Sequence, residues 1–175
     1  MVAPELKLLY SRDTITKEVE RLAREISEDF RDEEVLMVCV LKGSFFFTAD
    51  LIREITVPAS IDFVRLASYG SDTRSSGIVE IRKDLEMPLK NRNVIIVEDI
   101  IDSGHTIETL YHRLAMREPK ALKVCTLIDK KGRREVDFEA DYVGLTMDDG
   151  FIIGYGLDLD EKYRNLNEIY LVENA

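Results

Sequence analysis

Three carboxylates and a turn rich in hydroxyl groups lie close together in the middle of the chain. The stretch reads Glu98-Asp99-Ile100-Ile101-Asp102-Ser103-Gly104-His105-Thr106, and it follows the apolar run 94–97. A glycine-bearing turn that opens a helix presents unsatisfied backbone N–H groups, and flanking hydroxyls add donors, so such a turn can bind a phosphate. Because the Gly-Lys-Ser/Thr ending of a Walker loop is missing, the pattern predicts a phosphate cradle of another type.

The three carboxylates would repel a phosphate if they acted alone. A cation or a hydroxyl-rich sugar between them removes this conflict, and carboxylate oxygens are ligands that Mg²⁺ accepts. A ribose phosphate that carries a magnesium pyrophosphate meets both requirements. The simpler alternative, an acidic loop that caps a helix, would be favoured for a short acidic cluster alone. The strand before the motif and the helix after it favour a binding site.

Strand-like and helix-like segments alternate along the chain and must position this motif. Apolar runs predict strands at 35–41, 61–66, 78–81, 93–97 and 122–127. Helical spacing predicts a helix at 15–30 after a capping region at 11–14, and further helices at 45–52 and from 107 to before Pro119. We place the carboxylates in a loop after the strand 93–97. Right-handed crossovers then give an α/β fold, a mostly parallel twisted sheet flanked by helices, whose ligands bind beyond the carboxyl ends of the strands. Short strand candidates at 142–145, 151–153 and 169–172 partly form a small hood over the site.

The composition limits the class of protein. The chain has 175 residues, 45% of them hydrophobic, which predicts a single domain over residues 1–175. A net charge of −10 disfavours nucleic acid as a partner. No apolar run approaches the roughly 20 residues of a membrane span, and the first residues do not resemble a signal peptide, so we expect no membrane partner and a cytoplasmic location. Cys39 and Cys125 lie inside apolar runs and predict buried, reduced thiols.

The string 97–104 resembles the 5-phosphoribosyl-1-diphosphate signature of the type I phosphoribosyltransferases, and in particular that of the hypoxanthine-guanine phosphoribosyltransferases. The resemblance covers nearly the whole chain, including Leu41-Lys42-Gly43-Ser44, Ser68-Tyr69-Gly70, Asp129-Lys130, the stretch 151–158 and Tyr163-Arg164. It implies the type I fold, with a hood built from the N-terminal segment and the C-terminal part. It also implies purine salvage, in which the phosphoribosyl group is transferred to hypoxanthine or guanine to give IMP or GMP and pyrophosphate.

The resemblance also implies roles for individual residues. Ser103, Gly104, His105 and Thr106 bind the 5′-phosphate, Glu98 and Asp99 face the ribose and the metal shell, and Asp102 accepts a proton from the purine. Asp102 could instead cap the helix, but Ser103 and Thr106 are available for that. Because relatives fill position 105 differently, His105 is given no catalytic role.

Further roles follow in the same way. Lys42, Gly43 and Arg164 bind pyrophosphate, with a Leu41–Lys42 peptide bond that can be cis. Glu98 and Asp99 belong to the metal shell, and Asp158 is a ligand to a second Mg²⁺, directly or through water. Lys130 donates to the 6-oxygen of the base, Phe151 stacks on its ring and Ile152 meets its edge, while Ser68 and Tyr69 belong to a closing lid. Each of these residues alone would be an ordinary charged or core residue. The resemblance further implies a homodimer or homotetramer that pairs through residues 42–52.

Two other functions are compatible with part of this pattern. An enzyme of the same fold could use another base; the surroundings of Lys130 and Phe151 disfavour adenine and pyrimidines, but xanthine stays open, as does the balance between hypoxanthine and guanine. A regulatory protein could keep the sugar-phosphate site and bind nucleic acid instead. Asp102 and the acidic net charge both oppose this second rival.

Overall fold

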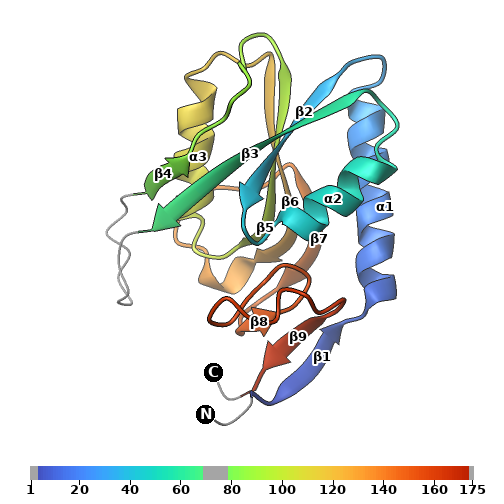
Figure 1. Cartoon of the computed structure of the whole chain (residues 1–175), viewed down its shortest axis with the longest axis vertical. Coiled ribbons are helices and arrows are strands. Elements are labelled where there is room, and N and C mark those ends of the chain that lie inside the picture. Colours follow the sequence, from blue (N-terminus) through green and yellow to red (C-terminus); the bar gives the residue numbers. More distant parts are fainter. Residues whose placement is uncertain (1–3, 69–78, 174–175) are drawn as a thin grey trace.

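The larger of two sheets has six strands in the order β4-β3-β2-β5-β6-β7 (Figure 1). The computed structural model describes residues 4–68 and 79–173. The strands are β2 (Val35–Leu41), β3 (Ala59–Ser68), β4 (Val79–Lys83), β5 (Asn93–Ile101), β6 (Ala121–Lys130) and β7 (Tyr142–Met147). All neighbouring pairs are parallel except β3 and β4. The predicted mostly parallel sheet is therefore confirmed.

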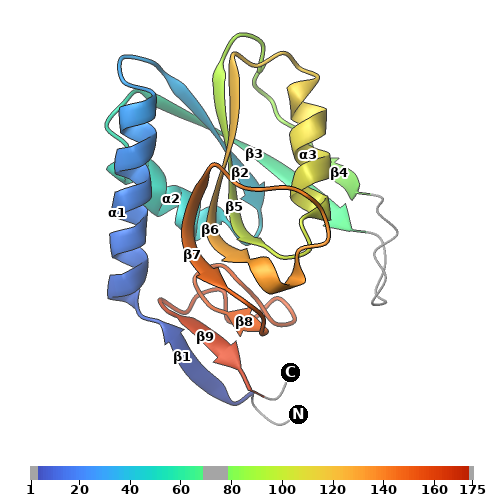
Figure 2. The ribbon, with the colours of Figure 1, turned by 180° about the vertical axis from the view of Figure 1, so that it is seen from behind.

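Helices cover both faces of this sheet (Figures 1 and 2). Helices α1 (Arg12–Asp29) and α2 (Phe45–Glu54) lie on one face, and α3 (His105–Ala115) lies on the other; a short 3₁₀ helix, η1 (Lys131–Arg133), follows β6. Helix α1 begins at Arg12, inside the predicted capping region, because the Ser11 hydroxyl accepts a hydrogen bond from the Thr14 N–H at 3.2 Å. Its apolar stripe, which includes Leu22 and Ile26, is fully buried against the sheet.

The central strands bury both of their faces. Met37 and Ile95 pack in the cluster beneath α1 and α2, whereas their neighbours Val38 and Ile96 pack in the cluster beneath α3. All four side chains have no exposed surface. This arrangement explains the continuous apolar runs, since a strand covered on both sides has no solvent face for polar residues.

A second, smaller sheet lies beyond the carboxyl ends of β5 and β6 (Figure 2). It has the order β1-β9-β8, with β1 at Leu6–Tyr10, β8 at Ile152–Ile153 and β9 at Ile169–Val172. Strand β9 is antiparallel to both neighbours, with Leu6 opposite Val172 and Ile152 opposite Leu171. We call this sheet the hood. Among the described residues, no helix has the length and apolar character needed to span a bilayer.

Several strands, such as β3 and β6, extend beyond their predicted bounds, and the extension of β5 affects the acidic motif. Strand β5 continues to Ile101, so Glu98 and Asp99 lie on a strand and not in a loop. The reason is the parallel ladder with β6, in which Glu98 is opposite Thr126 and Ile101 is opposite Asp129. In the tail, β7 extends the main sheet beside β6, and only β8 and β9 join the hood. The single-domain boundary 1–175 stays a prediction.

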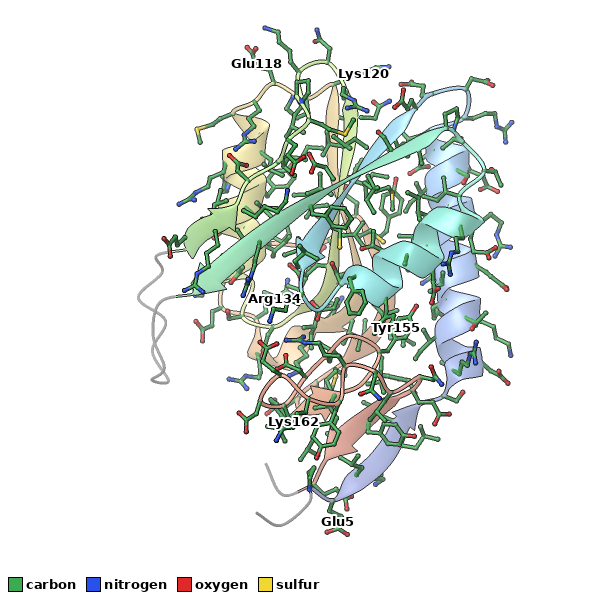
Figure 3. The ribbon with its side chains drawn as sticks, in the orientation of Figure 1. Glu5, Glu118, Lys120, Arg134, Tyr155 and Lys162 are labelled. Atoms are coloured by element: carbon green, nitrogen blue, oxygen red, sulfur yellow. The ribbon has the colours of Figure 1, made fainter. Side chains whose placement is uncertain are left out.

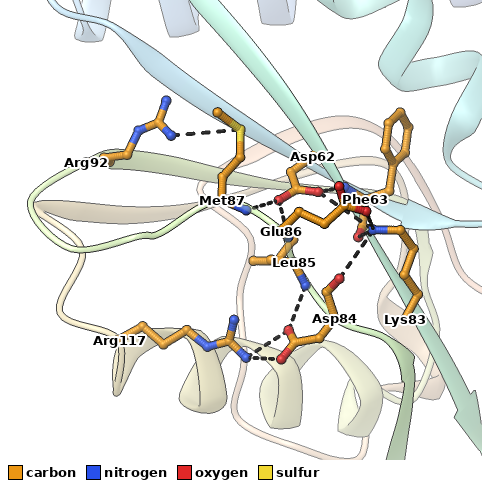
Figure 4. Close-up of polar contacts among 9 residues, drawn as sticks. All are labelled: Asp62, Phe63, Lys83, Asp84, Leu85, Glu86, Met87, Arg92 and Arg117. Carbon is orange, nitrogen blue, oxygen red and sulfur yellow. Dashed lines mark hydrogen bonds and ion pairs between the residues drawn. The ribbon is translucent and has the colours of Figure 1, made fainter.

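A buried carboxylate anchors the connection from β4 to β5 at the edge of the sheet (Figure 4). Asp62 on β3 is 5% exposed and accepts hydrogen bonds from the backbone N–H groups of Glu86 and Met87, each at 2.8 Å. Nearby, Arg117 holds both oxygens of Asp84 at 2.8 and 2.7 Å. These contacts fix the chain that leads into β5, the strand that carries the acidic motif.

Candidate active site

The turn between β5 and α3 has the geometry expected of the predicted phosphate cradle. Gly104 is the residue before the first turn of α3, and its φ of 92° is a left-handed conformation that favours glycine. A Cβ at this position would lie 2.6 Å from Cγ2 of Val136, so the packing also requires glycine. No side chain of the described residues caps α3, contrary to the expectation for Ser103 and Thr106. The first N–H groups of α3 are thus available to a phosphate, beside a cavity of about 240 Å³ that Ser103 and Thr106 help to line.

The carboxylates of Glu98 and Asp99 are both 9% exposed. Burial, followed by repulsion from Asp99, raises the pKa of Glu98 well above its usual value, and burial also raises the pKa of Asp99. A divalent cation or sugar hydroxyls beside the pair would offset this cost. Among the described residues, no three acidic, histidine or cysteine side chains converge on one point, so an ion here would take its other ligands from substrate and water.

The turn after β2 lies directly against this carboxylate pair. The Leu41–Lys42 peptide bond is cis, as the resemblance implied. A Cβ at Gly43 would lie 1.7 Å from Oδ2 of Asp99, and a Cβ at Gly156 would lie 2.0 Å from the Gly43 carbonyl oxygen. The turn, the carboxylate and the tail therefore meet with no room for a side chain between them.

A cleft of about 1020 Å³ joins several predicted site residues. It is lined by Asp99, Asp102, Lys130, Phe151, Ile152 and Asp158, together with Arg133 and other residues. Lys130 is 5% exposed, and its Nζ lies 3.6 Å from Oδ2 of Asp102. The other oxygen of Asp102, Oδ1, is buried and has no hydrogen-bond partner among the described residues. Phe151 is 40% exposed, which favours a ligand-stacking role over a core role.

The predicted pyrophosphate ligands lie on loops that approach one another at this end of the molecule. Nζ of Lys42 donates to Oε2 of Glu161 at 2.7 Å. Nη2 of Arg164 lies 2.8 Å from Oδ1 of Asp158 and 3.4 Å from the same Glu161 oxygen. Nη1 of Arg164 donates to the Gly156 carbonyl at 2.7 Å, while its Nε is buried and has no hydrogen-bond partner in the described chain. The structure thus brings Lys42, Asp158 and Arg164 together through Glu161.

The predicted lid is only partly described. Ser68 is the last residue of β3, and its side chain is not described. Tyr69 lies outside the described residues. The lid role of both residues stays a prediction.

Comparison with known proteins identifies the family. A model of the phosphoribosyl transferase domain matches residues 8–160. The chain belongs to the phosphoribosyltransferase family. It is 44% identical to the hypoxanthine-guanine phosphoribosyltransferase of Aquifex aeolicus, over 97% of this chain and 96% of that protein. It is also 41% identical to the hypoxanthine-guanine-xanthine phosphoribosyltransferase of Tritrichomonas foetus, over 97% and 92%.

Solved structures agree with this assignment. A crystal structure of a hypoxanthine-guanine phosphoribosyltransferase from Bacillus anthracis superimposes with a TM-score of 0.92 and 49% identity, covering 96% of this chain and 99% of that one. The predicted type I fold and the predicted class of enzyme, a pentosyltransferase of purine salvage, are both confirmed.

Sequence reasoning missed the contacts that support the cradle of this phosphoribosyltransferase from behind. Nε of Arg134 donates to the Asp102 carbonyl at 3.2 Å, and the same guanidinium contacts the buried Asp129 carboxylate and the Phe138 carbonyl. The Glu135 N–H donates to the Ser103 carbonyl at 2.9 Å. Figure 3 labels Arg134 in this position. The polar stretch 131–138 carries no sequence signal for such a role, because the role depends on how this segment packs against the turn.

Proposed function

We propose that this protein transfers the 5-phosphoribosyl group of 5-phosphoribosyl-1-diphosphate to hypoxanthine or guanine, giving IMP or GMP and pyrophosphate. One observation carries the proposal. A phosphate cradle, a buried carboxylate pair, and a buried lysine beside Asp102 line two cavities that share Asp99 and Asp102, at the carboxyl ends of parallel strands. This is where open α/β sheets bind their ligands.

The donor is held at its two ends. The first N–H groups of α3, with Ser103 and Thr106, bind the 5′-phosphate, and His105 contributes its backbone N–H. Lys42, the Gly43 backbone and Arg164 bind the diphosphate. They stabilise the negative charge that grows on the leaving oxygen as the bond from the anomeric carbon to diphosphate breaks.

Asp102 manages the proton of the base. As an imidazole nitrogen of the purine bonds to the anomeric carbon, that nitrogen loses its proton to the Asp102 carboxylate. Oδ1 of Asp102 accepts no hydrogen bond from the described residues, although Nε of Arg133 lies 3.5 Å away, so this oxygen retains the capacity to accept a proton. Asp102 lies at the end of β5, beside both the cradle and the base cleft, so it can reach the nitrogen nearest the ribose.

Lys130, Phe151 and Ile152 recognise the base. The ammonium of Lys130 has three donors and no acceptor, so it makes a charge-assisted hydrogen bond to a 6-oxygen and opposes a 6-amino group. Its near-complete burial makes this choice strict, because an unmatched buried donor is costly. Phe151 stacks on the purine ring, and Ile152 meets the edge of the ring through its backbone.

Mg²⁺ is the cofactor we propose. The buried pair Glu98 and Asp99 would offer carboxylate oxygens to a hard cation, and Asp158, which lines the same cleft as Asp99, would reach an ion directly or through water. When bound, the ion neutralises charge on the diphosphate. A chelator should abolish donor binding measured by calorimetry; full binding in chelator would rule out the metal role.

The proposal also covers the domain, the lid, the location and the association of the protein. Residues 1–175 form one domain, Ser68 and Tyr69 close over the substrates, and the protein is located in the cytoplasm. Copies of the chain associate through the face of α2, where Phe45 is 37% exposed beside a cavity of about 570 Å³. Light scattering at micromolar concentration tests the association, and a monomer would contradict it.

The decisive experiment compares initial rates with hypoxanthine, guanine, xanthine and adenine at saturating donor. Adenine should be slower by up to about 10⁴–10⁵, because a site built around one hydrogen bond rejects a base that cannot make it. Lys130→Ala should lose activity mainly with the oxo bases and so narrow the gap. Equal use of adenine and hypoxanthine by the wild type, or an unchanged preference in Lys130→Ala, would overturn the role of Lys130.

A further inference from the structure

One exposed carboxylate bridges the two cations assigned to pyrophosphate. Oε2 of Glu161 accepts a hydrogen bond from Lys42 Nζ at 2.7 Å and lies 3.4 Å from Arg164 Nη2. The Glu161 side chain is 63% exposed, whereas that of Arg164 is 18% exposed. Glu161 has none of the substrate-binding roles described above, yet it contacts both cationic ligands of the leaving group.

A tight turn presents this carboxylate to the cations. Asp160 and Glu161 have φ values of 51° and 62°, a left-handed conformation that is unfavourable for residues with a Cβ. The Glu161 N–H donates to Oδ2 of Asp158 at 2.9 Å, and Leu159 and Lys162 pair across the turn. The position of Glu161 is therefore built into the backbone and does not depend on a long, freely rotating side chain alone.

The carboxylate has the chemistry of a pyrophosphate oxygen. It is anionic, it accepts hydrogen bonds, and it uses the same Lys42 and Arg164 donors that a diphosphate needs. The hydrogen bond from Lys42 lowers the pKa of Glu161, which keeps it charged at neutral pH. Arg164 also retains a buried Nε–H with no hydrogen-bond partner among the described residues, as expected for a guanidinium whose full set of acceptors includes a ligand.

We propose that Glu161 is an internal competitor of pyrophosphate. Its carboxylate occupies Lys42 and Arg164 in the ligand-free enzyme, moves into solvent when the diphosphate of the donor binds, and returns when pyrophosphate leaves. The proposal rests on the proposed function, since it takes Lys42 and Arg164 as pyrophosphate ligands. Because Glu161 is exposed, its displacement leaves no buried charge unpaired, so the competition weakens diphosphate binding modestly, by about 2- to 10-fold.

The test measures the affinity of magnesium pyrophosphate by calorimetry and by product inhibition against the donor. The variants are Glu161→Gln, Glu161→Ala and the control Glu118→Gln. Glu118 forms a similarly exposed pair with Lys90 at 2.8 Å, and its loss changes the net charge by the same amount. It lies at the opposite end of the molecule from Lys162, the neighbour of Glu161 (Figure 3).

Both Glu161 variants should bind pyrophosphate about 2- to 10-fold more tightly than the wild type, and Glu118→Gln should match the wild type. Affinity for the nucleoside monophosphate product, which lacks the diphosphate, should stay within about twofold in every variant. Unchanged or weaker pyrophosphate binding in the Glu161 variants would overturn the proposal. Equal tightening for the monophosphate would overturn it too, because the effect would then be a general effect of charge.

Failure of the proposed function gives a different result. In that case the wild type would form no nucleotide from hypoxanthine and the donor. If the wild type forms the nucleotide and the Glu161 variants bind pyrophosphate as it does, only the competitor role is lost.

Discussion

Gly43→Ala is expected to destabilise the protein through one identified neighbour. The three atoms nearest to the added Cβ all belong to Asp99, with Oδ2 at 1.7 Å, Cγ at 2.5 Å and Oδ1 at 3.0 Å. The Asp99 side chain is 9% exposed and cannot turn aside freely. Overpacking of this kind costs about 1–3 kcal/mol. For a domain of this size, that loss lowers Tm by roughly 2–12 °C, measured by calorimetry of the metal-free protein.

A double-mutant cycle with Asp99→Ala tests whether the Asp99 side chain is the obstacle to a Cβ at position 43. In the Asp99→Ala background the obstructing atoms are gone, and Gly43 has no positive φ that would strain alanine. Gly43→Ala should then be neutral, or stabilising by up to about 1 kcal/mol through the unfolded chain. The expected coupling is therefore about 1–3 kcal/mol. An equal cost in both backgrounds would show that Asp99 is not the obstacle.

Gly156→Ala is the matched control for the cycle. Its Cβ would meet the Gly43 carbonyl oxygen at 2.0 Å, and its φ of 101° is unfavourable for alanine. The obstacle is backbone, so Asp99→Ala should not relieve its cost. In activity assays, Gly43→Ala alone should raise the KM for the donor, because it displaces a carboxylate of the proposed ribose and metal site.

Three further predictions concern individual side chains. Asp102→Asn should keep the fold and the donor affinity while lowering kcat by about 10²–10⁴, and near-normal kcat would remove its role as proton acceptor. Arg134→Met should lower the free energy of unfolding by about 3–5 kcal/mol in urea, because the buried Asp129 carboxylate loses its partner; a loss below about 1 kcal/mol would contradict this. The pKa of Glu98 is higher in the folded protein than its value of 4.5 in the unfolded chain. The protonated side chain therefore stabilises the fold at low pH, and this contribution is lost as pH rises through the folded pKa. The metal-free variant Glu98→Gln should therefore lose less free energy of unfolding between pH 5 and pH 8 than the metal-free wild type. Parallel stability curves for the two proteins would refute that cause.

The sequence was most informative where local pattern decides structure. The apolar run at β2 and the Ser11 cap of α1 are local features. Strand β2 has its predicted bounds, and α1 begins inside its predicted capping region. The end of β5 was wrong because Glu98 and Asp99 have the polarity of a loop, whereas pairing with β6 keeps them in the sheet. The family resemblance did not depend on that boundary, since the motif is contiguous in the chain.

Contacts between distant segments could not be predicted in the same way. The hydrogen bond between Lys42 and Glu161 forms only because the turn after β2 and the C-terminal tail lie at the same end of the sheet. Arg134 reaches the Asp102 carbonyl only because the segment after β6 folds back over the turn before α3. Neither residue type nor spacing predicts these two contacts. Each contact forms only when segments that are distant in the chain pack against each other in the fold.

The hood has a consequence for the synthesis of the protein. Strand β1 is made well before its hydrogen-bond partner β9, because Leu6 lies opposite Val172. At about 5–20 residues per second, β1 waits roughly 10–30 s for this partner. During that time its edge is unpaired and Leu8, which remains 50% exposed in the finished fold, faces solvent. The parallel sheet can assemble while translation continues, but the base cleft, which β8 and β9 help to line, closes only when the last strand has left the ribosome.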